Sequence, residues 1–228
     1  MSSGPVTLAL ELSQKDGSIA ILGNSGEVVY RNIFGGRSDE DELMPSIADA
    51  AKQIGISPNQ IELVVVSVGP GGFTGLRTAV ATAKMIAYST GAKLVSVDSP
   101  IVVANAANMG DGPFVVLSCI KKDNLWLSTV WFSNNSWKCE SQLATNKELE
   151  SCNENISCCF ADTFLSKESR ELLNSFDISV YPLKPTAASL LEIGLLLYQQ
   201  GVVIDPHDLM PTYPREPESV RRWNERRG

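Results

Sequence analysis

Runs of apolar residues and the polar turns between them divide the first half of the chain into seven elements. Apolar or alternating runs bounded by turn residues predict strands. Apolar residues at helical spacing behind an acidic first turn predict one helix, and a second helix is expected to end at Gly91. The predicted elements are strands Val6–Leu12, Ser18–Leu22, Glu27–Ile33, Leu63–Val68 and Leu94–Val97, with helices Glu40–Ile54 and Thr74–Thr90. The first half therefore reads βββαβαβ.

The second half of the chain repeats this order. Its predicted elements are strands Phe114–Ile120, Leu125–Phe132, Trp137–Leu143, Ser157–Phe160 and Ile178–Tyr181, with helices Asn146–Ser151, Phe164–Phe176 and Thr186–Gln200. Three antiparallel strands followed by alternating helices and parallel strands, written twice, predict an α/β protein with the actin-like, ribonuclease-H-type duplicated fold.

The polar, glycine-containing stretch Asn108–Pro113 is typical of a boundary between two lobes. We therefore expect an N-terminal lobe over residues 1–108 and a C-terminal lobe over residues 109–228. Packing of the last helix and the tail back onto the first lobe is left open.

Composition narrows the chemistry that the chain can perform. The 228 residues include one histidine, His207, which excludes any metal site built from two histidines of this chain. The five cysteines contain no CxxC pair and are expected to be reduced thiols. No secretory signal is seen and no apolar run approaches the ~20 residues that span a bilayer. A cytoplasmic protein without a membrane contact is expected.

The net charge of the chain indicates whether nucleic acid is an expected partner. The formal net charge of −7 argues against a broad nucleic-acid surface, which needs clustered Lys and Arg. The arginines of the tail, with Trp223 for stacking, leave a contact with RNA open beside a simple solvated segment.

A glycine-rich turn joins the predicted buried strand to the second helix. Its residues are Gly69, Pro70, Gly71 and Gly72, followed by Thr74 as the expected N-cap and by Gly75. The sequence fits neither a Walker A loop nor the GxGxxG fingerprint. A helix N-terminus behind such a turn is a general anion site, and a tight structural turn explains the same glycines equally. Both interpretations stay open here.

The helix behind this turn carries a stripe of small side chains. Ala79, Ala83 and Ala87 recur at every fourth residue, and further apolar residues extend almost around the helix, which indicates burial on two sides. One side is expected to face the sheet. The other side faces either the Glu40–Ile54 helix or a partner protein.

The residues of the turn also carry a family resemblance. GPGGFTGLR at positions 69–77 resembles the GPGSFTGLR signature of the bacterial TsaB (YeaZ) family, with Gly72 in place of the usual serine. Leu43–Ile47 looks like the LLPxI helix of that family, and Ser96–Pro100 is similar to its next strand and loop. Leu209–Arg215 resembles its PxYxR segment near the C-terminus. The match covers the N-terminal half and the end of the C-terminal half.

This resemblance implies a non-catalytic scaffold that stabilises TsaD, the paralogue that transfers threonylcarbamoyl to adenosine 37 of tRNAs that read ANN codons. A TsaE-like ATPase would join the pair, tRNA would be met only through the complex, and the chain alone would form a homodimer. The two helices of the N-terminal lobe would contact the TsaD-like subunit. The residues expected to do so are Leu43, Met44, Ile47, Arg77, Val80, Ala83, Lys84 and Ala87. Ala83→Glu is then expected to abolish pairing and leave the monomer folded.

Two departures from catalytic relatives argue against an enzyme, and a third is a departure from the family's own pattern. Leu10–Gln14 lacks the phosphate turn that follows the first strand of nucleotide-binding actin-like proteins. Ser99–Asn108 lacks the HxxxH pair of TsaD, and Cys119–Lys121 stands where many family members have Asp-Ala-Arg. We expect no catalytic residue, no metal and no intrinsic cofactor, with nucleotide at most at the boundary with the partner. The alternative is an ATP-dependent phosphotransferase or glycoprotease-type metallopeptidase, for which Asp39, Asp41 and Asp98 are the candidate groups.

Overall fold

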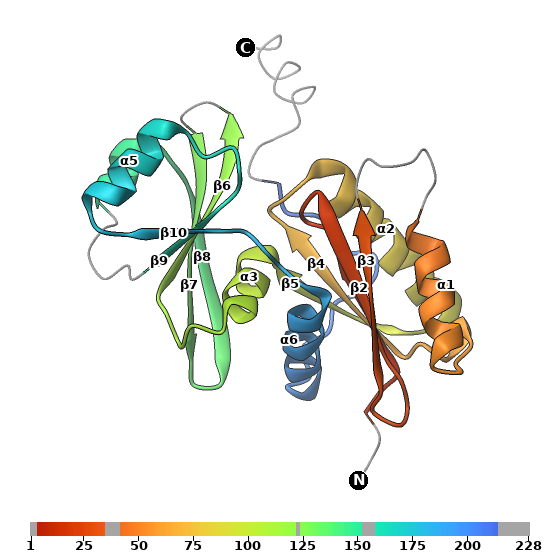
Figure 1. The fold of residues 1–228 in the computed structure, drawn as a ribbon. Helices are drawn as coiled ribbons and strands as arrows, with labels where there is room; N and C mark the ends of the chain where they lie inside the picture. Colours follow the sequence, from red (N-terminus) through yellow and green to blue (C-terminus); the bar gives the residue numbers. More distant parts are fainter. Residues whose placement is uncertain (1–3, 35–41, 122–123, 152–157, 214–228) are drawn as a thin grey trace, which may run out of the picture.

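Two five-stranded sheets form the framework of the molecule (Figure 1). The computed structural model describes residues 4–34, 42–121, 124–151 and 158–213. The strand order is β3-β2-β1-β4-β5 in the first sheet and β10-β9-β6-β7-β8 in the second. Read from the other edge, the second order is β8-β7-β6-β9-β10, so both sheets place their successive strands identically. The predicted duplication is confirmed.

The N-terminal lobe follows the predicted βββαβαβ order and adds one helix. Its strands are β1 (Thr7–Glu11), β2 (Asp16–Leu22), β3 (Val28–Phe34), β4 (Leu63–Gly69) and β5 (Lys93–Asp98). Its helices are α1 (Leu43–Gln53), the short 3₁₀ turn Pro58–Gln60, α2 (Phe73–Thr90) and α3 (Ser99–Ala107). Strand β1 pairs antiparallel with β2 and parallel with β4, which places it at the centre of the sheet.

The C-terminal lobe has the same plan. Its strands are β6 (Phe114–Lys121), β7 (Asn124–Ser133), β8 (Ser136–Ala144), β9 (Cys158–Ala161) and β10 (Ser179–Pro182), and its helices are α4 (Asn146–Ser151), α5 (Lys167–Ser175) and α6 (Ala187–Gln199). Strand β6 is central, antiparallel to β7 and parallel to β9.

Helices cover both faces of the first sheet. On one face of the first sheet, α1 and α2 cover large residues such as Leu8, Leu10 and Val66. On the other face, α3 and α6 cover smaller residues, including Ala9 and Ala20. Helix α6 therefore packs on the first sheet although it follows the second one in the chain, and it lies beside α3 between the two sheets in Figure 1.

Helix α3 is the element that the sequence pattern did not reveal. Its residues Val103 and Ala104 pack against Phe114 and Val116 of the second sheet, while Val102 packs into the first. Burial between two sheets removes the polar face by which a helix is ordinarily recognised. Because α3 contacts strands of both sheets, it joins the two lobes.

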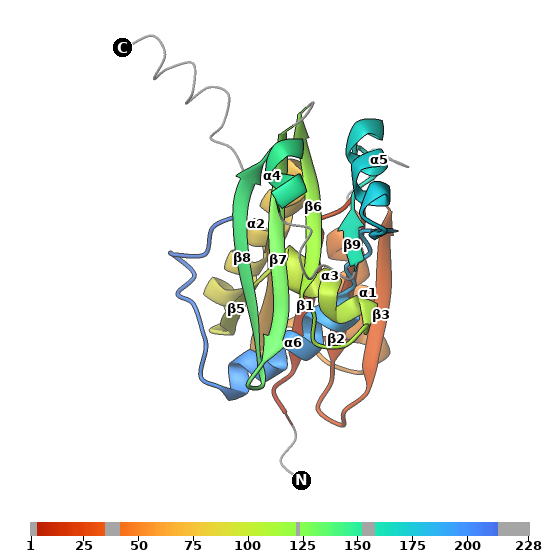
Figure 2. The ribbon, with the colours of Figure 1, turned by 90° about the vertical axis from the view of Figure 1, so that its left-hand side faces the viewer.

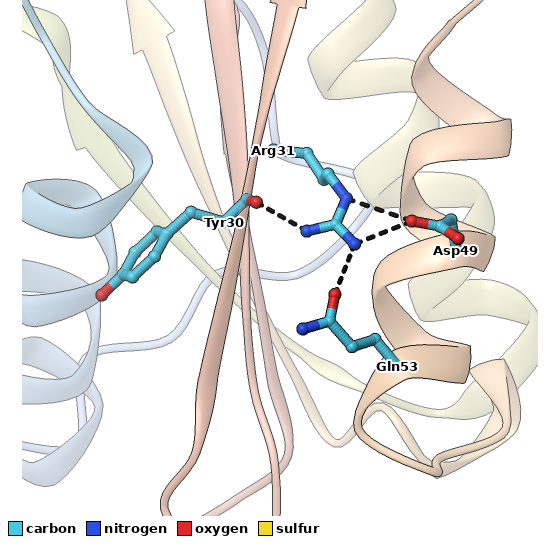
Figure 3. A network of polar contacts seen from close by, with 4 residues as sticks. All are labelled: Tyr30, Arg31, Asp49 and Gln53. Carbon is cyan, nitrogen blue, oxygen red and sulfur yellow. Dashed lines mark hydrogen bonds and ion pairs between the residues drawn. The ribbon is translucent and has the colours of Figure 1, made fainter.

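An arginine on β3 fixes α1 to the edge of the first sheet (Figure 3). The Nε and Nη2 groups of Arg31 donate to Asp49 Oδ2 at 3.1 and 2.7 Å, and Nη2 also donates to Gln53 Oε1. The Nη1 group donates to the carbonyl oxygen of Tyr30 at 2.9 Å, which orients the guanidinium. Both α1 partners lie one helical turn apart, so the contact restrains the helix along its length.

Replacing Arg31 by methionine is expected to lower the free energy of unfolding by about 0.5–1 kcal/mol, because the ion pair is largely exposed. The loss should shrink in 1 M NaCl, where exposed charges are screened. Chemical denaturation at low and high salt measures both effects. Lys52→Met is the matched control, since Lys52 is exposed on the same helix and makes no ion pair with a described residue. An equal loss of unfolding free energy in Arg31→Met and Lys52→Met would contradict a stabilising role for the Arg31–Asp49 ion pair.

Candidate functional site

A cleft of about 1250 Å³ lies between the two lobes. The N-terminal lobe lines it with the turn after β1 and with the glycine-rich turn before α2, and the C-terminal lobe lines it with the ends of β6, β9 and β10. The exposed side chains of Phe73 in the N-terminal lobe and Phe164 in the C-terminal lobe both line it. This cleft and the adjoining surface of α2 are the candidate site.

Close contact between two turns forms the floor of the cleft. The amide of Gly72 donates to the carbonyl oxygen of Ser13 at 2.8 Å. A Cβ atom on Gly71 would lie 2.3 Å from that oxygen, and one on Gly75 would lie 2.1 Å from the carbonyl oxygen of Leu12. Any side chain at these two positions would force the turns apart, so tight packing accounts for both glycines.

The N-cap of α2 differs from the prediction. Gly72 occupies the N-cap position without a side-chain cap, and Thr74 lies inside the first turn. The sequence pointed to Thr74 because threonine is a common capping residue. The Gly72 amide donates to the carbonyl oxygen of Ser13, and a Cβ atom at this position would lie 3.7 Å from that oxygen, which is an ordinary contact. Gly69 and Pro70 lie just before it, at the end of β4.

The C-terminal segment returns to this turn along the side of the N-terminal lobe (Figure 2). It pairs with β5 through the Leu94–Ile204 bridge and buries Leu209 completely in the core beneath α2. The amide of Thr212 then donates to the carbonyl oxygen of Val68 at 2.7 Å. The two family-like segments, at positions 69–77 and 209–213, thus lie together in the structure. Their separate positions in the sequence could not reveal this contact.

A buried carboxyl group lies beneath the glycine turn. Glu11, at the end of β1, is 1% exposed, and its Oε1 atom accepts from the Ser13 amide at 2.8 Å. Burial raises the pKa of Glu11, and the neighbouring Ser13 and Ser67 only partly oppose this rise. Ser67 in turn bonds the hydroxyl of Ser99 at 2.7 Å. Glu11 does not line the cleft, so it supports the floor and does not meet a ligand there.

Cys119 lines the opposite side of the cleft. Its backbone amide donates to Asp162 Oδ2 at 2.7 Å. Burial, together with the negative charge of Asp162, raises the pKa of the Cys119 thiol to about 12. The thiol is therefore protonated at neutral pH and is a weak nucleophile.

The remaining sequence candidates lie away from the cleft or outside the described residues. Burial raises the pKa of Asp98, which ends β5 and is absent from the cleft lining. His207 is exposed beside Asp208, as expected for a surface residue. Asp39, Asp41 and the tail arginines lie outside the described residues. Within the described ranges no three His, Cys, Asp or Glu side chains group as metal ligands, and no helix is long and apolar enough to cross a membrane.

The residues of the expected partner-binding set differ in exposure. Five of its members are buried inside the N-terminal lobe, and the alanine stripe of α2 faces the core. They are Leu43, Ile47, Val80, Ala83 and Ala87. Because Ala83 is 0% exposed, Ala83→Glu cannot be expected to leave the monomer folded. Of the others, Met44 and Arg77 are exposed and Lys84 is partly buried, donating to the carbonyl oxygen of His207 at 3.3 Å.

Besides Arg77, the exposed surface of α2 includes residues that the expected set did not contain. Periodicity showed that the helix was apolar almost all round, and so it could not tell the inward stripe from the outward one. Five exposed residues form one row along the helix: Thr74, Thr78, Ala81, Met85 and Tyr88. We call these five residues the docking face.

Glu11→Gln tests the buried carboxyl. The folded protein holds the Glu11 proton more tightly than the unfolded chain, because burial raises the pKa above its ordinary 4.5. Stability is therefore lost as pH rises from about 4.5 through the raised pKa, and glutamine avoids this loss. We expect the variant to be more stable than the wild type at pH 8 by about 1–3 kcal/mol, with the gap closing toward pH 4.5.

Denaturant unfolding between pH 4.5 and pH 8 measures this difference. Glu140→Gln on β8 is the control, because it removes an exposed carboxyl from the same chain. If the difference in unfolding free energy between Glu11→Gln and the wild type stays constant with pH, Glu11 is not desolvated.

Comparison with known proteins shows which family model and which curated protein this chain resembles. The family model TsaD, described as tRNA N6-adenosine threonylcarbamoyltransferase, matches residues 31–120. The tRNA threonylcarbamoyladenosine biosynthesis protein TsaB of Haemophilus influenzae is 28% identical over 100 residues. That alignment covers 44% of this chain and 42% of the relative, so it spans less than half of the curated protein.

Two solved structures from Pseudomonas aeruginosa share the fold over nearly the whole chain. An uncharacterized protein with similarity to peptidase YEAZ aligns with a TM-score of 0.76 and 17% identity, over 93% of this chain and 100% of that one. YeaZ itself aligns with a TM-score of 0.72 and 17% identity, over 92% and 100%. The duplicated actin-like fold is thereby confirmed. The chain is therefore similar in sequence to TsaD and TsaB proteins over part of its length, and similar in fold to the two YeaZ structures over nearly all of it.

Proposed function

We propose that the chain is a non-catalytic scaffold that stabilises a TsaD-like catalytic subunit in the threonylcarbamoyladenosine modification of tRNA position 37. The family supports a place in this pathway, and the docking face supports the scaffold role. The chain would meet ANN-decoding tRNAs through the complex, and a TsaE-like ATPase would join the pair.

The docking face is the observation that carries this proposal. Its residues are spaced by four, three, four and three positions along α2, the spacing by which one helix seats against another in a bundle. Met85 is 53% exposed and Tyr88 is 66% exposed, and the small, exposed Ala81 lies one turn before Met85. A row of apolar and small side chains left in water is typical of a protein-binding surface.

Helix α1 can extend this surface. It packs on the same side of the first sheet as α2 and exposes Met44 and Ala48. Two helices from each partner would form a bundle, and a stable pairing of this kind buries roughly 1,600 Å² counting both sides. The same surface would pair two copies of the chain when the TsaD-like subunit is absent.

The chemistry of the cleft supports the absence of catalysis by this chain alone. The Glu11 carboxyl is sealed below the cleft, and the Cys119 thiol has a pKa near 12. Neither group is suited to act as a base or nucleophile at neutral pH. No cofactor of its own is proposed, and a nucleotide would bind at most at the boundary with the partner.

Two alanines on α2 test the docking face as a matched pair. Ala81→Glu places a charge on the exposed side and should abolish co-purification with the TsaD-like subunit while the monomer stays folded. Ala83→Glu places the same charge in the core and should lower the free energy of unfolding by at least about 3 kcal/mol. Affinity chromatography measures pairing, and circular dichroism with thermal unfolding measures folding.

Normal pairing by Ala81→Glu would show that α2 is not the contact. A stable Ala83→Glu variant would show that the alanine stripe does not face the core.

The size of the cleft favours a second function, an active enzyme of the same superfamily. A cavity of about 1250 Å³ between two lobes is large enough for a nucleotide. Calorimetry of the purified chain with ATP and Mg²⁺ separates the two functions. The scaffold role predicts no turnover by the chain alone, and tight binding with ATP hydrolysis or phosphate transfer would favour the enzyme.

A further inference from the structure

Helix α2 is positively charged in a protein that is acidic overall. Between Phe73 and Thr90 it contains Arg77 and Lys84 and no acidic residue, whereas the chain carries a formal net charge of −7. Lys84 is directed to the carbonyl oxygen of His207 at 3.3 Å. Arg77 is exposed and lies one turn before Ala81, on the same side of the helix as the docking face.

The guanidinium of Arg77 is held in place from within the chain. Its Nε atom donates to the hydroxyl oxygen of Tyr213 at 3.0 Å. Its central carbon lies 3.8 Å from the ring centroid of Phe73 and 5.9 Å from that of Tyr213. The two rings also contact each other, with centroids 5.3 Å apart. One edge and one face of the guanidinium are therefore already engaged.

The two terminal amino groups of Arg77 have no hydrogen bond or ion pair to any described residue. An arginine fixed through Nε and by ring stacking presents these groups as a planar fork. Such a fork matches a carboxylate, which accepts two parallel hydrogen bonds from it. Orientation before binding also reduces the entropy lost when the contact forms.

We propose that Arg77 is a specificity-determining contact of the docking face, where its terminal amino groups bind a carboxylate on the partner subunit. Tyr213 is a positioning residue that acts through Arg77. This inference rests on the proposed function, since it names the chemistry that the TsaD-like subunit must present beside Ala81, Met85 and Tyr88. An Asp or Glu on the helix that packs along α2 is required.

A protein carboxylate fits this position better than an RNA phosphate. Nucleic-acid surfaces neutralise several phosphates with clustered cations, whereas the side chains around Arg77 on this face are small or apolar. The net charge of −7 would also repel a polyanion. A charged contact at the edge of an apolar surface is typical of protein interfaces, where it selects the partner.

Three variants of the full chain separate the parts of this contact. Arg77→Gln removes the charge and should raise the Kd for the TsaD-like subunit about 10-fold or more. Arg77→Lys keeps the charge but loses the planar fork, so its Kd should rise several-fold while the salt dependence of binding is kept. Tyr213→Phe keeps the ring and removes the hydroxyl that accepts the hydrogen bond from Arg77 Nε. A smaller rise in Kd, about 2- to 5-fold, is expected.

Calorimetric titration at 50 and 300 mM NaCl measures these effects. Binding by the wild type should weaken with salt, and Arg77→Gln should flatten this dependence, a change that loss of folding alone would not produce. Lys138→Gln on β8 is the control, because it removes one exposed positive charge from the other lobe. It should bind like the wild type. Thermal unfolding of each variant verifies that the chain is folded.

Outcomes that overturn the inference differ from those that overturn the proposed function. If the wild type binds the TsaD-like subunit and Arg77→Gln binds equally well at both salt concentrations, Arg77 does not contact a carboxylate and the scaffold role stands. If Arg77→Gln leaves pairing intact but weakens retention of tRNA by the complex, Arg77 binds a phosphate instead. If the wild type does not bind the subunit at all, the proposed function is wrong and this inference falls with it.

Discussion

The contact between the glycine turn and the end of β1 is the constraint on which the rest of the site depends. The bond from the Gly72 amide to the Ser13 carbonyl brings the start of α2 against the floor of the cleft, and Gly71 and Gly75 allow this approach because they lack side chains. The bond from Thr212 to Val68 ties the C-terminal segment to the same place. Beneath it, the buried Glu11 carboxyl accepts from Ser13. The direction of α2, the shape of the cleft and the position of Arg77 all follow from this junction.

Helix α2 has two different surfaces, one buried against the sheet and one exposed. The inward stripe of alanines lets the helix lie close to its own sheet, and the outward row from Thr74 to Tyr88 remains available to a second protein. Tyr213 and Phe73 hold the guanidinium of Arg77, and its terminal amino groups make no hydrogen bond or ion pair with a described residue. This chain keeps the duplicated fold, and its buried Glu11 and protonated Cys119 are poorly suited to chemistry in the cleft.

Local patterning in the sequence predicts most of this fold, because the strands and most helices show a clear period of their own. Every predicted strand that lies in the described residues is present, and α4 and α6 fall within a residue of their predicted bounds. Helix α3 was missed because it is buried on two sides and has no polar face. The alanine stripe was recognised, but its direction depends on which face the sheet covers, which one helix cannot show. The Arg77–Tyr213 contact joins residues 136 positions apart, so no local pattern encodes it.

Hydrogen–deuterium exchange of the chain, alone and with an excess of the TsaD-like subunit, tests the central claim most directly. The scaffold role predicts that protection on binding concentrates in peptides covering α2, with further protection in α1, while the C-terminal lobe exchanges as before. The variant Ala81→Glu should show none of this protection under the same conditions. Protection centred on β7 and β8, or no change in α2 despite saturating partner, would contradict the account.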